Sequence, residues 1–276
     1  MYFLLIVLSL ISGFDHPESV LPSGNVLYVS NIGRTLDATG KDGDGYISCV
    51  DLTTHKVTHF FDSLDAPKGM ALYGQTLYVA DIDHIVGIDI PTRRRVLDLP
   101  IPGTHFLNDL ALGDGKLYAS ATDNGKVYEI DLSSLSCRAL PLSDTVTGAN
   151  GLCYDGAHHL LYCVGVGHWG SNDGRVVAID LSSFSVTPLC NYRGLLDGVD
   201  RVGDTLYFSD WRGVQDSKGV ILALDLRSHA VSEVPLGGGA GAARTFIAGP
   251  ADFCVHGVEF IVPETLTGKI LFIPRP

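Results

Sequence analysis

The chain has 276 residues, of which 46% are apolar, and this is enough to bury a large core. Its formal net charge is −12 at pH 7 and its basic residues cluster only at 93–95, so we expect no positively charged surface for nucleic acid. The six cysteines stand singly, without a Cys-x-x-Cys pair, and this argues against both a zinc site and a disulfide framework.

The first fourteen residues, MYFLLIVLSLISGF, are apolar but too few for a membrane span. Two interpretations remain open for residues 1–13. The length of the stretch favours a secretory signal peptide, in which case the protein is secreted or periplasmic. Alternatively, these residues form a strand that pairs with the C-terminal end of the chain and closes the fold, in which case the protein is cytoplasmic.

From residue 17 onward the chain repeats one pattern six times: a short polar step, an apolar run, a turn rich in Gly, Asp or Asn, and a strand that usually contains Leu-Tyr. The copies start at Pro17, Pro67, Leu107, Ala149, Leu195 and Pro250. A third strand follows each copy, and in the first five it ends in an aspartate that we expect to cap the next turn: Asp51, Asp89, Asp131, Asp180 and Asp225.

A fourth strand follows in the first five copies, and no segment shows sustained helical periodicity. Repeats of this length suit the four-stranded blades of a β-propeller. The sequence therefore predicts an all-β protein in which residues 14–276 form a single six-bladed β-propeller of four-stranded antiparallel blades.

One position in each repeat carries the chemistry. Superposing the copies aligns six residues that lie 40 to 54 residues apart: Glu18, Lys68, Asn108, Asn150, Asp197 and Ala251. If each begins the innermost strand of its blade, all six side chains point to the axis. Two carboxylates and two amide oxygens, without Cys or His, suit a hard cation, and calcium is the natural choice. The alternative is that Asn and Asp at strand starts only form turns.

The polar steps PESV, LNDL, ANGL and LDGV resemble those of the calcium-dependent six-bladed propellers of the gluconolactonase and regucalcin (senescence marker protein) family, with paraoxonase and diisopropyl-fluorophosphatase as more distant relatives. The resemblance spans residues 14–276. It implies that Glu18, Asn150 and Asp197 hold the catalytic metal, that Asn108 completes the shell or contacts the substrate, and that Asp197 is the general base or nucleophile.

Two positions depart from that pattern. Sugar lactonases of the family have an arginine two residues before the asparagine of the third copy, where this chain has Phe106, so an aldonolactone is not the expected substrate. The second copy places Lys68 at the axis, where its ammonium would be repelled by a dication. Lys68 therefore binds an anionic substrate as a catalytic residue, takes the place of the metal, or extends to solvent.

A divalent ion in a narrow pocket polarises the carbonyl of a lactone or ester, or lowers the pKa of a bound water. A neighbouring carboxylate, Asp197, then takes a proton or attacks directly. The sequence thus predicts a calcium-dependent hydrolase of the lactonase or esterase type, with a small-molecule substrate. The alternative is a non-catalytic binding module with a structural calcium, since propellers host both. The oligomeric state stays open.

The loops that join second to third strands return to the face where the inner strands begin, so they are expected to wall the pocket. They span residues 30–45, 81–84, 122–125, 165–174, 209–219 and 263–268. The expected pocket residues, in these loops or just before Asn108, are Asp81, His84, His105, Phe106, His168, Trp169, Asp210, Trp211 and Arg212.

Overall fold

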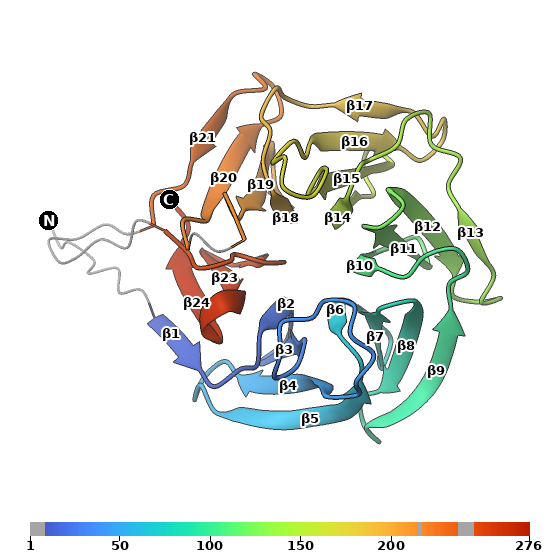
Figure 1. Cartoon of the computed structure of the whole chain (residues 1–276), viewed down its shortest axis with the longest axis vertical. Coiled ribbons are helices and arrows are strands. Elements are labelled where there is room, and N and C mark those ends of the chain that lie inside the picture. Colours follow the sequence, from blue (N-terminus) through green and yellow to red (C-terminus); the bar gives the residue numbers. More distant parts are fainter. Residues whose placement is uncertain (1–8, 215–216, 237–245) are drawn as a thin grey trace, which may run out of the picture.

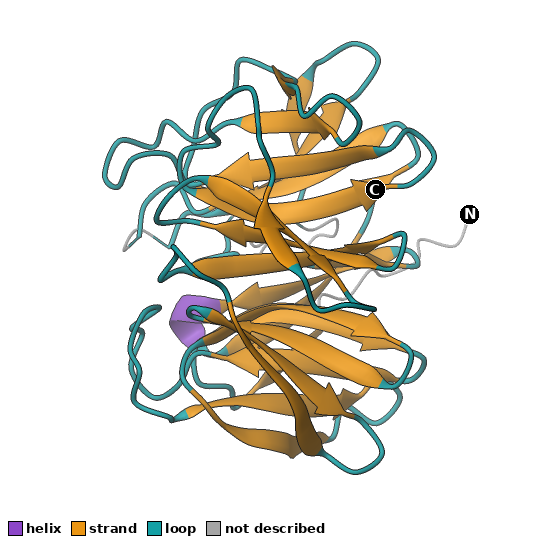
Figure 2. Cartoon of the chain, turned by 90° about the vertical axis from the view of Figure 1, so that its right-hand side faces the viewer, coloured by secondary structure: helices purple, strands orange, loops and turns teal. Residues whose placement is uncertain are grey.

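The computed structural model describes residues 9–214, 217–236 and 246–276. Its strands form six four-stranded antiparallel sheets around a central axis, which confirms the six-bladed β-propeller (Figure 1). Within the first five blades the chain runs from the innermost strand outward, and each blade is a simple meander. Seen from the side, the connecting loops gather at the two faces of a disc (Figure 2).

The first five blades take their strands in chain order. The first two blades consist of β2 (Pro17–Ser23), β3 (Val26–Asn31), β4 (Gly45–Asp51) and β5 (Val57–Leu64), then β6 (Pro67–Tyr73), β7 (Thr76–Asp81), β8 (His84–Asp89) and β9 (Arg94–Pro100). The third and fourth consist of β10 (Leu107–Gly113), β11 (Lys116–Ala121), β12 (Lys126–Asp131) and β13 (Cys137–Ala139), then β14 (Ala149–Asp155), β15 (Leu160–Gly165), β16 (Val176–Asp180) and β17 (Val186–Pro188). The fifth consists of β18 (Leu196–Val202), β19 (Thr205–Asp210), β20 (Val220–Asp225) and β21 (Val231–Glu233).

The sixth blade is built from both ends of the chain. Its strands are β22 (Cys254–His256), β23 (Glu259–Glu264), β24 (Lys269–Pro274) and, outermost, β1 (Ser9–Ser12). Ser9 pairs with Phe272 and Ser12 with Lys269, so residues 9–12 occupy the place of the fourth strand that the last repeat lacks. The signal peptide stays a prediction, and residues 1–8 lie outside the described part of the chain.

The Leu-Tyr pair in the second strand of the first five blades explains how neighbouring blades pack against each other. Successive strand residues point to opposite faces of a sheet. Leu27 therefore packs into the cluster shared with the sixth blade, and Tyr28 into the cluster shared with the second blade. Leu77 and Tyr78 divide in the same way between the first and third blades. The core is thus a ring of apolar layers between neighbouring blades.

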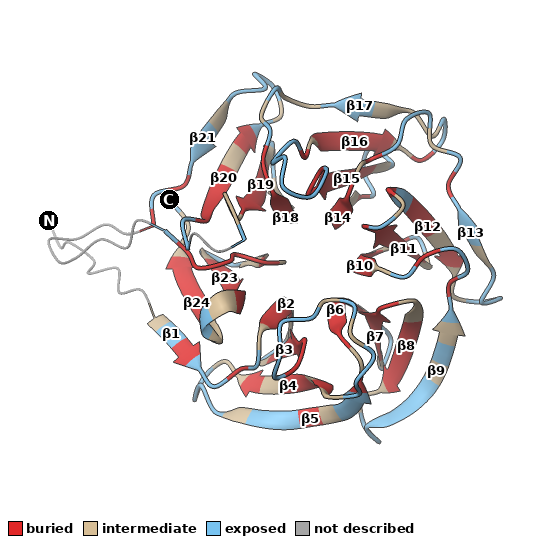
Figure 3. Ribbon diagram, in the orientation of Figure 1, coloured by how far each residue is buried: buried red, intermediate tan, exposed pale blue. Residues whose placement is uncertain are grey.

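The outer strands are exposed, whereas the inner and middle strands are buried (Figure 3). The predicted turn caps after the third strands are confirmed: Asp51, for example, accepts hydrogen bonds from the backbone N–H groups of Thr53 and Thr54 at 2.9 and 2.7 Å. The described residues contain a single 3-10 turn, η1 (Thr265–Thr267), and none of them belongs to a helix with the length and hydropathy to cross a membrane.

Candidate functional site

Each of the first five inner strands begins with a β-bulge. In β2 the register steps from Pro17 opposite Asn31 to Val20 opposite Val29, so Glu18 and Ser19 face one residue of β3. The same step occurs in β6, β10, β14 and β18. A bulge bends the strand and redirects a side chain. The bulge therefore takes the predicted axial residues out of the alternation that buries their neighbours between blades.

The bulges bring the four predicted oxygen donors into one cavity on the axis: Glu18, Asn108, Asn150 and Asp197. Lys68 lines the same cavity, and Ala251 is fully buried. Each of the four donors is less than a tenth exposed, and each has a buried side-chain oxygen without a hydrogen-bond partner: Glu18 Oε2, Asn108 Oδ1, Asn150 Oδ1 and Asp197 Oδ1. Such groups are rare, because an unpaired buried polar atom costs about 1–3 kcal/mol.

Neighbouring side chains hold two of these donors in place. The Asn108 amide nitrogen donates to Thr122 Oγ1 at 3.1 Å, and Thr122 in turn donates to the carbonyl of Ala149 at 2.8 Å. Trp211 Nε1 donates to Asp197 Oδ2 at 2.8 Å. These bonds fix the amide nitrogen of Asn108 and one carboxylate oxygen of Asp197. The Oδ1 atom of each residue is left for a ligand.

The two carboxylates lie in a strongly desolvated place. Burial raises the pKa of Glu18 well above its usual range, and the charge of Asp197 adds to this effect. Burial also raises the pKa of Asp197 to about 8, followed by the charge of Asp252, while hydrogen bonds from Trp211 and Asn150 act in the opposite direction. A cation beside them would favour their charged forms.

The donor set fits a divalent hard cation. Two carboxylates and two amide oxygens provide oxygen ligands of the kind that Ca²⁺ prefers, and water or substrate can supply the rest of its six to eight positions. A soft or borderline metal would need thiolate or imidazole ligands. Among the described residues no cluster of three or more His, Cys, Asp or Glu side chains is placed to hold a metal. The site therefore depends on its two asparagines as much as on its two acids.

Lys68 reaches the cavity from the bulge of the second blade and is 1% exposed. Its Nζ donates to the carbonyl of Ala66 at 2.7 Å and lies 5.1 Å from the centre of the Phe106 ring. Burial lowers the pKa of Lys68 to about 8, while the charge of Glu18, the largest opposing effect, works to raise it. The ammonium thus lines the cavity and does not extend to solvent.

The cavity has a volume of about 150 Å³, and its walls are mostly apolar. Four of the six expected loops contribute to it, those at 30–45, 165–174, 209–219 and 263–268. The wall residues are Ile32, Leu36, Ala38, Phe106, Val166, Trp169, Leu195, Trp211, Val214 and Thr265. The rings of Phe106 and Trp169 lie nearly parallel, with centres 6.5 Å apart, so they bound one side of the entrance.

Two aspartates that were expected in the pocket lie outside the cavity, because they bind backbone groups. Asp81 accepts hydrogen bonds from the N–H groups of Asp65 and Ala66, just before the inner strand β6. Asp210 accepts from the N–H of Leu195, just before β18. The aspartates that end β7 and β19 thus clamp the segments that lead into the inner strands β6 and β18.

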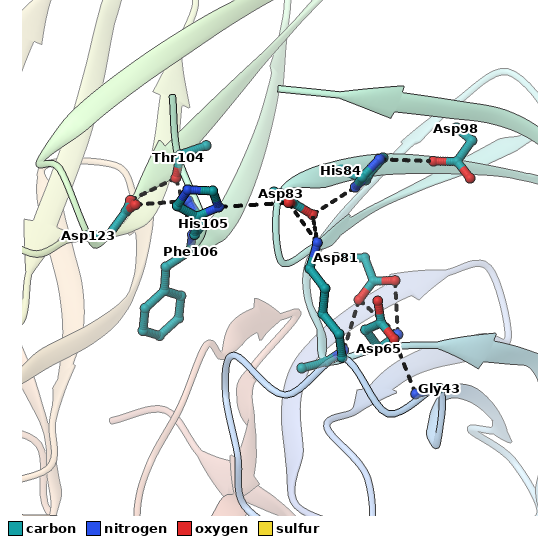
Figure 4. A network of polar contacts seen from close by, with 12 residues as sticks. Gly43, Asp65, Asp81, Asp83, His84, Asp98, Thr104, His105, Phe106 and Asp123 are labelled. Atoms are coloured by element: carbon teal, nitrogen blue, oxygen red, sulfur yellow. Dashed lines mark hydrogen bonds and ion pairs between the residues drawn. The ribbon is translucent and has the colours of Figure 1, made fainter. Parts of the chain in front are cut away.

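Two expected histidines also lie outside the cavity, in a polar network between the second and third blades (Figure 4). Asp83 is its centre and contacts His84 Nδ1 at 2.8 Å, His105 Nδ1 at 3.9 Å and Lys41 Nζ at 2.7 Å. The Phe106 ring turns away from this network (Figure 4). His105 therefore lies on the rim, and its neighbour Phe106 lies in the wall.

The remaining two expected residues are engaged elsewhere. His168 Nδ1 lies at hydrogen-bond distance from Asp173 Oδ2, 2.8 Å, beside the cavity. Arg212 binds Glu233 of the outer strand β21. Of the nine residues expected in the pocket walls, the cavity is lined by Phe106, Trp169 and Trp211.

Two kinds of residue in and near the cavity were not expected from the sequence. Leu36, Ala38 and Val214 line the cavity from loops, where apolar residues give no periodic signal. Below the donors, Asp109 binds the backbone N–H of Leu152 and so joins neighbouring blades, and desolvation raises the pKa of Asp109 to about 7. Asp109 and Asp252 each directly follow an axial position, and this placement was a signal for the second level.

No protein-family model and no curated protein matches the chain. Solved structures do match it. A chain in a nidogen/laminin complex is 20% identical, with a TM-score of 0.62 and 78% of both chains covered. The hydrazine synthase of Kuenenia stuttgartiensis is 16% identical, with a TM-score of 0.64 over 91% of this chain and 74% of the other. The computationally designed protein Ika8 is 9% identical, with a TM-score of 0.54 over 93% and 83%. These likenesses show the fold alone.

Proposed function

We propose that the protein is a calcium-dependent hydrolase that acts on a small-molecule lactone or ester at the axial cavity. One observation carries the proposal: four side-chain oxygens at equivalent positions of four blades line one cavity and lack protein partners. A fold that leaves four such atoms unsatisfied bears a cost that a bound cation removes. Glu18, Asn108, Asn150 and Asp197 would hold that cation.

A bound dication would polarise the carbonyl of the substrate and favour the attack of water on it. Asp197 is the residue that handles the proton. Its Oδ2 is fixed by Trp211, and its Oδ1 has no protein partner. A carboxylate in this position can take a proton from water and return it to the leaving oxygen. Water adds to the acyl carbon and the acyl C–O bond breaks. An ester gives an acid and an alcohol, and a lactone gives one hydroxy acid.

The apolar walls support an ester or lactone over a sugar derivative. The donor pattern resembles that of the gluconolactonase and regucalcin family, but Phe106 replaces the arginine expected for a sugar lactonase. Its ring lies in the cavity wall near Lys68. A substrate covered with hydroxyl groups would lose hydrogen bonds to water against this wall.

The test measures both calcium binding and the hydrolysis of substrates. Calcium is removed with a chelator and titrated back by calorimetry, and hydrolysis of a panel of lactones and aryl esters is followed with and without it. Glu18→Gln is expected to weaken calcium binding, and Asp197→Asn to lower kcat/KM by about a hundredfold or more. The matched controls are Glu129→Gln and Asp131→Asn, which change acids of the third blade that do not line the cavity.

Two outcomes decide against this function. If both axial variants keep the wild-type rates, the cavity is not the site of hydrolysis. If calcium binds through Glu18 and Asp197 but nothing in the panel is hydrolysed, the result supports the alternative of a non-catalytic propeller with a structural calcium.

A further inference from the structure

Lys68 is only partly satisfied by the protein. An ammonium carries three N–H donors. Within the described residues, Lys68 Nζ makes one hydrogen bond, to the carbonyl of Ala66, and no carboxylate lies within ion-pair distance of it. The side chain is nevertheless 1% exposed and lines the cavity. Two donors of a buried cation are therefore left for a ligand.

The space next to this ammonium is small and apolar. Phe106 stands over Nζ, and Trp169, Trp211, Leu36 and Val214 complete the walls. A cavity of about 150 Å³ is large enough for a benzene-sized molecule. The ligand part that fits here has about six to eight carbons and few polar atoms.

The charges on the cavity floor favour an anion when the dication is present. The carboxylates of Glu18 and Asp197 then balance the dication, and Lys68 loses the largest of the negative charges that act on it, which leaves the smaller effects of Asp81 and Asp37. Without the dication, Glu18 is the carboxyl group whose charge acts most strongly on the ammonium. Binding of an anion and binding of the dication should therefore strengthen each other.

We propose that the cavity binds a monocarboxylate of about six to eight carbons in all, its carboxylate on Lys68 and its apolar body against Phe106 and Trp169. Hexanoate is the simplest such molecule. The identity of the substrate rests on the proposed function. If that function holds, the substrates are esters or lactones with an apolar acyl part, and the carboxylate that Lys68 binds is the acid that their hydrolysis produces. The binding itself does not depend on catalysis.

Tryptophan fluorescence can be used to measure this binding. The chain has two tryptophans, Trp169 and Trp211, and both line the cavity. Their fluorescence is followed while hexanoate is added to the calcium-loaded protein, and in a parallel titration the neutral isostere hexanamide is added. We expect hexanoate to bind about tenfold more tightly than hexanamide, since hydrogen bonds to a charged group are the stronger kind.

Lys68→Met is expected to abolish this preference while hexanamide still binds, because the apolar walls stay in place. Lys126→Met, which changes an exposed lysine of the third blade, is the matched control and should keep the preference. The inference is overturned if Lys68→Met keeps the preference for the acid. Equal binding of acid and amide to the wild-type protein overturns it as well, and this comparison needs no variant.

The outcomes separate this inference from the proposed function. If hexanoate binds as expected but aryl hexanoates are not hydrolysed, the carboxylate site stands and the hydrolase does not. If esters are hydrolysed without any preference for hexanoate over hexanamide, the hydrolase stands and Lys68 has another role.

Discussion

Replacing Asp197 by Asn should change how the stability of the calcium-free protein depends on pH. In the folded chain the pKa of Asp197 is about 8, against an ordinary value of 3.8, chiefly because the carboxyl group is buried. The folded state therefore binds this proton more strongly than the unfolded state does. The resulting stability is fully present below about pH 4 and is lost as the pH rises through about 8.

The size of the effect follows from the same shift. Between these two pH values the folded state holds about one extra proton, which corresponds to about 1.4 kcal/mol for each pH unit. From pH 5 to pH 8 the Asp197 carboxyl should therefore cost the wild-type protein about 4 kcal/mol of unfolding free energy. The Asn side chain does not titrate, so this loss should be absent from the variant. The variant also removes a charge that raises the pKa of Glu18, which increases the difference.

The measurement is urea unfolding of both proteins at pH 5 and pH 8 in the presence of a chelator. Asp131→Asn is the matched control, because backbone and hydroxyl hydrogen bonds lower the pKa of Asp131 to about 2 and it does not titrate in this range. Calcium should remove most of the loss in the wild-type protein, since it stabilises the charged carboxylate. The reasoning is refuted if wild type and Asp197→Asn lose the same free energy between the two pH values without calcium.

Three further changes test the contacts that hold the blades and loops around the cavity. Gly151→Ala should lower the unfolding free energy by about 1–3 kcal/mol, because its Cβ would meet the backbone oxygen of Asp197 at 2.3 Å; urea unfolding against Gly156→Ala measures this. Lys41→Gln removes the 2.7 Å ion pair between Asp83 and the loop 30–45, which supplies Leu36 and Ala38 to the cavity wall. The affinity for the ligand in fluorescence titrations should therefore fall by about fivefold at most, and high salt should reduce the difference between variant and wild type. Deleting residues 1–12 exposes the edge of β24 and removes the contacts of buried Ile11. Thermal unfolding should then show that the unfolding free energy falls by about 2 kcal/mol or more, and sedimentation should show self-association.

The sequence was sufficient to predict the propeller and the axial positions, because both depend on repetition. The Leu-Tyr pair recurs in the second strand where one face of each blade meets the next, and the polar step recurs where the inner strand has its extra residue. A polar side chain inside an otherwise apolar strand is visible without any knowledge of the loops.

The walls were less predictable, because they depend on contacts between loops. Asp81 and Asp210 looked like mouth residues, yet each binds backbone N–H groups that would otherwise be unpaired. His84 and His105 contact Asp83, a residue that no sequence pattern singles out. Which of several polar groups a loop side chain contacts is decided by distances of a few ångströms, and repeat spacing does not contain that information.

The extra residue at the start of the inner strands makes the floor of the cavity modular. Because these residues stand outside the packing between blades, a side chain there can be exchanged without rebuilding a hydrophobic layer. The side chains at the six axial positions can therefore be substituted independently of the fold, and Ala251 is the smallest of them. New donor arrangements, and with them new ligands, are thus accessible through single substitutions on an unchanged scaffold.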